Sequence, residues 1–153
     1  MPRTRHPALV ATLWGGLIAG TLDVGAASLI SGYSPVVILK YIAGGVLGKT
    51  ALGGGTSNAV IGMLLQWAMS IIIAAIFVLA TRRRIASTRA WPVWGIAYGV
   101  LIFVVMNYVV LPLSALHAQQ HFSVFSFIAN LAAMLLFGWI VALFAKTRQT
   151  LSP

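Results

Sequence analysis

Four long apolar runs dominate the sequence and restrict how the chain can fold. A helix needs about 20 residues to cross the roughly 30 Å of hydrocarbon in a bilayer, because it rises about 1.5 Å per residue. Hydrophobic residues make up 60% of the chain and charged residues only 7%, which favours a membrane protein over a water-soluble domain. We therefore predict one all-α integral membrane domain over residues 1–153, a transmembrane four-helix bundle with spans at about 8–30, 58–81, 91–115 and 123–145.

The connection between the first two predicted spans contains a shorter apolar stretch. Ser34 and Pro35 are typical of a helix start, with Ser as the cap and Pro at the first helical position. The apolar stretch that follows is too short to cross a bilayer, and a glycine-rich run ends it. We expect residues 34–50 to form a short interfacial or re-entrant helix on the outer side, and a loosely ordered apolar loop is the alternative.

The net charge of +9 comes from basic residues that gather at one set of span ends. Of the ten lysines and arginines, all but Lys40 and Lys49 precede the first span, fill the second connection or follow the fourth span. The positive-inside rule then places both termini and the second connection in the cytoplasm. Clusters such as Arg82, Arg83 and Arg84 are typical of contacts with anionic lipids, and they lack the folded basic face that nucleic-acid binding requires.

Asp23 is the only acidic residue of the chain, and it lies inside the first predicted span. A carboxylate is costly to keep in hydrocarbon, so an acidic residue at this position is a candidate functional group. Gly16 and Gly20 share its helix face, and small residues at this spacing let a neighbouring helix approach closely. We therefore expect Asp23 to face protein, and we hypothesise that it pairs with Lys40 or Lys49 and so ties the first connection to the bundle.

The other three predicted spans each carry one amide side chain at a similar depth: Gln66, Asn107 and Asn130. Multiplying residue counts by the helical rise places these amides and Asp23 about 10 to 12 Å below the outer boundary. In a functional interpretation, Asp23 binds a cation or a proton, or anchors a polar substrate, with help from the amides. In a structural interpretation, the four side chains hydrogen-bond to one another between helices. We favour the structural interpretation for the amides and leave both open for Asp23.

Small residues and one proline mark further features of the second and third spans. Gly62 lies one turn before Gln66, and Gly95 and Gly99 lie four residues apart, so each span has a face suited to close helix packing. Pro112 has no N–H to donate to the carbonyl group four residues before it. We therefore expect the third span to bend or end there.

Motifs that suggest catalysis or metal binding are incomplete in this sequence. Residues 43–50 approach a phosphate-binding loop, but no alternating strand and helix pattern surrounds them and no acidic residue follows to organise magnesium. His117 and His121 are four residues apart in the outer connection, yet without a cysteine or a nearby carboxylate they are weak metal-ligand candidates. We expect no cofactor, no bound metal and no enzymatic activity.

Three segments give the chain a resemblance to a known group of proteins. They are the Gly-Thr-Leu-Asp run at residues 20–23, the Ile-Ala-Gly-Gly-Val-Leu-Gly run at 42–48, and the Asn-Tyr-Val-Val-Leu-Pro-Leu-Ser run at 107–114. With these the chain resembles a group of small uncharacterised bacterial integral membrane proteins. The resemblance implies a four-helix layout in the bacterial inner membrane and supplies no activity. It includes both Asp23 and Asn107.

Two function classes follow from these features. We rank first a non-enzymatic membrane component or accessory subunit that acts through lipid or protein contacts. The alternative is a transporter or channel for an ion or small solute, in which Asp23 is the coupling residue. Such a protein would be a homo-oligomer or part of a larger complex, because four helices enclose little volume. A hydrated cavity at Asp23 would favour the transporter, and a dry centre would favour the accessory subunit.

Overall fold

The computed structural model describes residues 7–81, 89–116 and 123–150, and this part of the chain is helical and contains no strand. Four long helices are each long and apolar enough to cross a bilayer, and they confirm the predicted all-α four-helix bundle. They are α1 (Pro7–Ser31), α3 (Thr56–Thr81), the span that begins with α4 (Trp91–Val105), and α6 (Val124–Thr150). The third span continues from α4 through η2 (Met106–Val110) into α5 (Leu111–Leu113).

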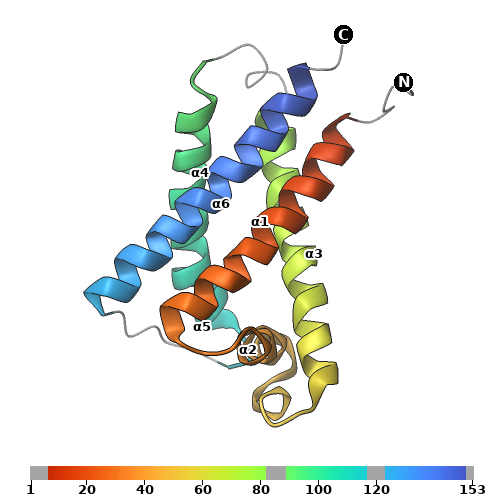
Figure 1. Ribbon diagram of the computed structural model, residues 1–153, viewed down its shortest axis with the longest axis vertical. Coiled ribbons are helices and arrows are strands. Elements are labelled where there is room, and N and C mark those ends of the chain that lie inside the picture. Colours follow the sequence, from red (N-terminus) through yellow and green to blue (C-terminus); the bar gives the residue numbers. More distant parts are fainter. Residues whose placement is uncertain (1–6, 82–88, 117–122, 151–153) are drawn as a thin grey trace.

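The helices pack in the order α3, α1, α6, α4 (Figure 1). The most extensive helix–helix interfaces are those of α1 with α3, α1 with α6, and α6 with α4. The start of α1, the end of α3, the start of α4 and the end of α6 lie at one end of the bundle, and α2 (Pro35–Leu47) and α5 lie at the other (Figure 1). This up-and-down arrangement agrees with the predicted topology, whose direction in the membrane stays a prediction.

The first connection forms a helix rather than a loose loop. Helix α2 begins with Pro35 at its first position, and Ser34 occupies the cap position without a hydrogen bond from its hydroxyl group. A short 3-10 turn, η1 (Lys49–Ala51), follows. Over the stretch that approaches a phosphate-binding loop, the Gly48 N–H donates to the Gly44 carbonyl oxygen at 2.8 Å. This amide thus serves the end of a helix, which differs from the strand-to-helix loop that cradles phosphate.

Helix α2 docks across the end of the bundle, where it contacts α3 and α1 (Figure 1). Its backbone passes so close to Gly62 of α3 that a Cβ atom there would overlap the carbonyl group of Leu39. The Ala115 N–H, just beyond α5, donates to the Gly45 carbonyl oxygen at 2.8 Å. Gly62 was expected to serve the packing of one span against another, but it accommodates α2 instead.

The expected packing faces of the other spans lie at close helix contacts. A Cβ atom on Gly16 of α1 would lie 2.7 Å from the Ile71 Cα atom of α3. In the same way, a Cβ atom on Gly99 of α4 would lie 2.5 Å from the Met134 carbonyl oxygen of α6. Gly95, one turn before Gly99, meets α6 at Gly138, Trp139 and Ala142. Glycines therefore allow the backbone of α1 to pack closely against that of α3, and the backbone of α4 against that of α6.

The break at Pro112 takes the form of a widened helical turn. Because Pro112 cannot donate to the Tyr108 carbonyl oxygen, the chain forms a π-helical turn, η2, in which the Leu111 N–H donates to the Met106 carbonyl oxygen. The helix then ends at Leu113. Asn107 lies within this turn and is buried.

Candidate functional site

Asp23 lies on the face of α1 that packs against α3, and Gln66 holds its carboxyl group. The Gln66 Nε2 atom donates to Asp23 Oδ2 at 2.9 Å and also lies 3.3 Å from the Gly20 carbonyl oxygen. The side chain of Gln66 is buried and that of Asp23 is half-buried. Gly20 makes this arrangement possible, because a Cβ atom there would overlap the Ser70 hydroxyl group on α3.

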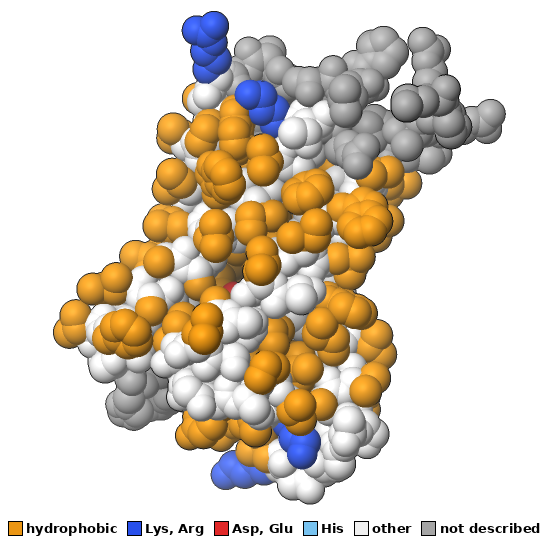
Figure 2. Space-filling model, viewed as in Figure 1, with side chains coloured by type: hydrophobic (Ala, Val, Ile, Leu, Met, Phe, Trp, Pro, Cys, Tyr) orange, Lys and Arg blue, Asp and Glu red, His pale blue; other side chains and the backbone are white. Residues whose placement is uncertain are grey.

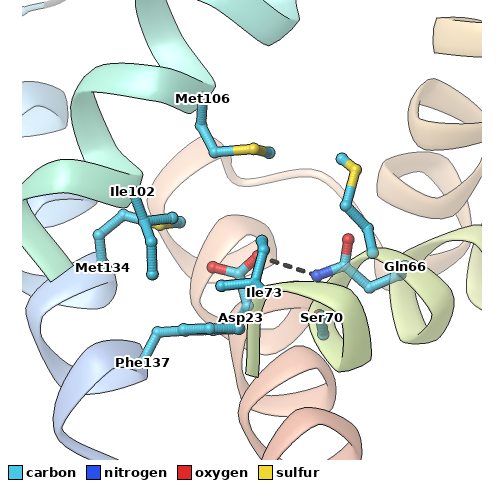
Figure 3. A pocket seen from close by; sticks show the side chains of 9 residues that line it. Asp23, Gln66, Ser70, Ile73, Ile102, Met106, Met134 and Phe137 are labelled. Carbon is cyan, nitrogen blue, oxygen red and sulfur yellow. Dashed lines mark hydrogen bonds between the residues drawn. The ribbon is translucent and has the colours of Figure 1, made fainter. Parts of the chain in front are cut away.

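The other carboxyl oxygen, Oδ1, has no hydrogen-bond partner among the residues that the structure describes. In Figure 3 it points away from Gln66, into a small cavity between the helices. The cavity has a volume of about 20 Å³, enough for roughly one water molecule or one small ion. Apart from Asp23, Gln66 and Ser70, its wall is apolar: Met69, Ile73, Ile102, Met106, Met134 and Phe137.

The cavity also reaches the surface of the bundle. Figure 2 shows the only acidic side chain as a small red spot within the apolar side of the molecule, between the ends where the described basic side chains lie. Asp23 is therefore turned toward the other helices while part of its surface remains accessible from the side. A small apolar reagent dissolved in the hydrocarbon therefore has a short route to the carboxyl group.

Asn107 and Asn130 form a second polar pair on the other side of the bundle. The Asn130 Nδ2 atom lies 3.3 Å from Asn107 Oδ1, to which it donates, and Asn107 Nδ2 donates to the Phe103 carbonyl oxygen at 2.8 Å. Neither asparagine lines the cavity at Asp23. The predicted layer is thus divided into two pairs, because α1 packs closely on α3 while the α4 span packs closely on α6.

The two lysines proposed as charge partners do not reach the carboxyl group. Lys40 lies on α2 and is half-buried, and Lys49 begins η1 and is exposed. The hydrogen bond that Asp23 receives comes from Gln66, and the described part of the chain contains no ion pair between Asp23 and either lysine. Because α2 docks near the start of α3, it stays at the end of the bundle and does not fold inward.

Several predicted residues lie outside the described ranges: His117, His121, Arg82, Arg83 and Arg84. Within the described ranges, no group of three or more His, Cys, Asp and Glu side chains is placed to hold a metal ion. The weak metal-ligand prediction for the two histidines and the lipid prediction for the arginines therefore stay predictions.

Sequence reasoning missed the group that joins α3 to α4 beside the cavity. The Tyr98 hydroxyl donates to the carbonyl oxygen of Ile73 at 2.7 Å, and the rings of Tyr98 and Phe77 lie 4.9 Å apart. Tyr98 carries a polar atom inside an apolar span, so the reasoning that selected the amides could also have selected it. Gly138 was missed as well, although Gly138 and Ala142 repeat the small-residue spacing seen in α4.

The fold and the composition together define a multi-pass membrane protein. Comparisons with protein-family models, with curated proteins and with solved structures found no match in any of the three. The resemblance carried by residues 20–23, 42–48 and 107–114 therefore stays a prediction. A more specific function has to be argued from the site itself.

Proposed function

We propose that the protein binds one monovalent cation, a proton included, at Asp23 inside the membrane, and that it does so as a small transporter or a subunit of one. The observation that carries this proposal is the second oxygen of Asp23, which faces a cavity and has no hydrogen-bond partner among the described residues. An asparagine would accept the same hydrogen bond from Gln66 without a negative charge. A negative charge at Asp23 is therefore not needed for the contact between α1 and α3.

Charge and size both favour a single monovalent cation. Asp23 is the only acidic residue of the chain, so one positive charge neutralises it, whereas a divalent ion would leave an uncompensated charge in the apolar interior. Calcium requires six to eight oxygen ligands and magnesium an octahedral set. A cavity of about 20 Å³ has no room for such a shell of water.

A non-enzymatic accessory subunit is the second candidate, and the small cavity favours it. A volume of about 20 Å³ holds an ion or a water molecule but no larger solute. Passage across the membrane would then require helices from further copies of the chain or from a larger complex. Neither candidate assigns a catalytic role to any residue.

The proposal includes a location and a direction. The protein would lie in the bacterial inner membrane with both termini in the cytoplasm, and Arg82, Arg83 and Arg84 would contact anionic headgroups. The distribution of basic residues supports the direction, and the resemblance supports the membrane. A reporter that is active only in the cytoplasm should be active when fused after residue 153 and inactive when fused after residue 52. The reverse pattern would overturn the proposed orientation, with both termini in the cytoplasm.

Reconstitution into proteoliposomes tests the proposed function. The purified chain and Asp23→Asn are inserted separately, and cation or proton entry is followed with an internal dye under an imposed potassium diffusion potential. We expect entry with the native chain and none with Asp23→Asn, which keeps an oxygen for Gln66 and should keep the fold, as circular dichroism would verify. Equal entry with both would refute a role for Asp23. No entry with either, together with stable co-purification of a larger complex, would favour the accessory subunit.

A further inference from the structure

Methionine side chains are concentrated around the carboxyl group of Asp23. The chain contains five methionines, and Met1 lies outside the described residues. Three of the remaining ones line the cavity, and we call Met69, Met106 and Met134 the cavity methionines. They come from α3, η2 and α6, while Asp23 comes from α1, so four helices converge on this point. Figure 3 shows Met106, Met134 and Phe137 on different sides of the carboxyl group.

We propose that this cavity binds one soft monovalent metal ion, Cu(I) or its redox-stable analogue Ag(I). The ligands are Asp23 Oδ1 and the thioether sulfur atoms of the cavity methionines. The inference rests on the proposed function, because it names the class of cation that the same site takes. Thioether sulfur is a soft ligand that selects Cu(I), whereas hard ions such as sodium and magnesium prefer oxygen.

The oxygen atoms around the cavity do not supply a site for a hard ion. Gln66 presents its amide nitrogen to Asp23, and its amide oxygen points away from the carboxyl group (Figure 3). Ser70 packs its hydroxyl group against Gly20, where an added Cβ atom would overlap it. Asp23 Oδ1 is therefore the charged side-chain oxygen on the wall of this cavity, beside the neutral hydroxyl group of Ser70. One oxygen and three sulfur atoms make a four-ligand set suited to a soft ion.

Charge balance gives an independent reason for a monovalent ion. The carboxylate of Asp23 carries a single negative charge, and thioethers are neutral, so Cu(I) or Ag(I) makes the filled site neutral overall. A neutral site costs far less inside a bilayer than an uncompensated carboxylate does. The cavity volume of about 20 Å³ matches one unhydrated ion.

Silver binding by the purified protein in a chloride-free detergent solution tests this inference. The chain contains no cysteine, and replacing His6, His117 and His121 by Asn removes the imidazoles, so methionine becomes the main remaining soft ligand. In this background we expect one Ag(I) bound per chain in isothermal titration. X-ray absorption at the silver edge should show sulfur neighbours.

The decisive variants replace methionine by leucine, which nearly conserves volume and removes the sulfur atom. The variant with all three cavity methionines changed should lose the bound silver, and each single change should weaken binding. Met63→Leu is the matched control, because Met63 is a half-buried methionine of α3 that does not line the cavity, and it should bind silver like the parent. If the cavity methionines only fill space, silver binding will be unchanged in every leucine variant. This result would overturn the inference. Absence of silver binding by the parent would overturn it too.

The failure of this inference can be told apart from failure of the proposed function. If Asp23→Asn abolishes cation entry into proteoliposomes while the leucine variants transport normally, Asp23 serves a proton or another cation and the soft-metal site is wrong. If silver binds through the cavity methionines but neither the native chain nor Asp23→Asn admits cations, the metal site stands and transport by the chain alone is wrong.

Discussion

The tight contact between α4 and α6 makes Gly99→Ala a quantitative test of the fold. The new Cβ atom would lie 2.5 Å from the Met134 carbonyl oxygen and 2.7 Å from the Leu135 Cα atom. Carbon atoms pack without strain at about 3.5 Å or more, so the two helices would have to separate by about 0.8 Å. Overpacking costs about 1 to 3 kcal/mol, and the upper end applies here because both obstructing atoms belong to the backbone. Since alanine favours the helix by about 1 kcal/mol over glycine, we expect a net loss of about 2 kcal/mol.

Gly25→Ala is the matched control for this prediction. Gly25 lies inside α1, and a Cβ atom there would meet nothing within 4 Å. Only the helix-propensity gain remains, so this variant should be more stable than the native protein by up to about 1 kcal/mol. Unfolding of both purified variants by SDS in mixed micelles, followed by circular dichroism, measures the difference. If Gly99→Ala proved as stable as Gly25→Ala, the close approach of α4 and α6 would be refuted.

Three further predictions use the same unfolding assay or hydrogen exchange. Gln66→Leu removes the donor to Asp23 and should lower the free energy of unfolding by about 1 to 3 kcal/mol, and no loss would argue against that hydrogen bond. Tyr98→Phe removes the 2.7 Å hydrogen bond to the Ile73 carbonyl oxygen. The free energy of unfolding should fall by about 0.6 kcal/mol, the average for such bonds between membrane helices, and a gain in stability would contradict this hydrogen bond. Gly62→Ala should displace α2, so amide hydrogen exchange should become faster in α2 and stay unchanged in α6. Unchanged exchange in α2 would contradict the docking of α2 against Gly62 of α3.

The spans and the start of α2 could be predicted because each depends on local sequence. Crossing hydrocarbon requires a long apolar helix, and Pro35 fixes the backbone geometry of a first helical position. The disturbance at Pro112 follows from a missing N–H, although the sequence did not indicate that the chain would respond with a π-helical turn. These features require no knowledge of which helix lies beside which.

The arrangement of the site depends on helix pairing, which the sequence indicated less well. Counting residues placed Asp23 and the three amides at one depth but could not show that they would separate into two pairs on opposite sides of the bundle. Pairing of Asp23 with a lysine required α2 to fold inward, and the contact of α2 with Gly62 keeps it at the end. The cavity methionines gave no signal in the sequence, because methionine is counted among the apolar residues of a span and only the packing brings these three side chains to the cavity at Asp23.

The central claim is that Asp23 lies within the membrane with a carboxyl oxygen free to bind a cation. An apolar carbodiimide tests it directly, because such reagents partition into bilayers and modify protonated carboxyl groups, and Asp23 is the only acidic side chain in the sequence. In native membranes we expect one adduct, mapped to Asp23 by mass spectrometry, slower to form when Ag(I) is present and absent from Asp23→Asn. A water-soluble carbodiimide should leave Asp23 unmodified. Labelling by the water-soluble reagent instead of the apolar one would contradict the account. An apolar adduct that forms at the same rate with and without Ag(I) would overturn the silver site and leave the buried carboxyl group in place.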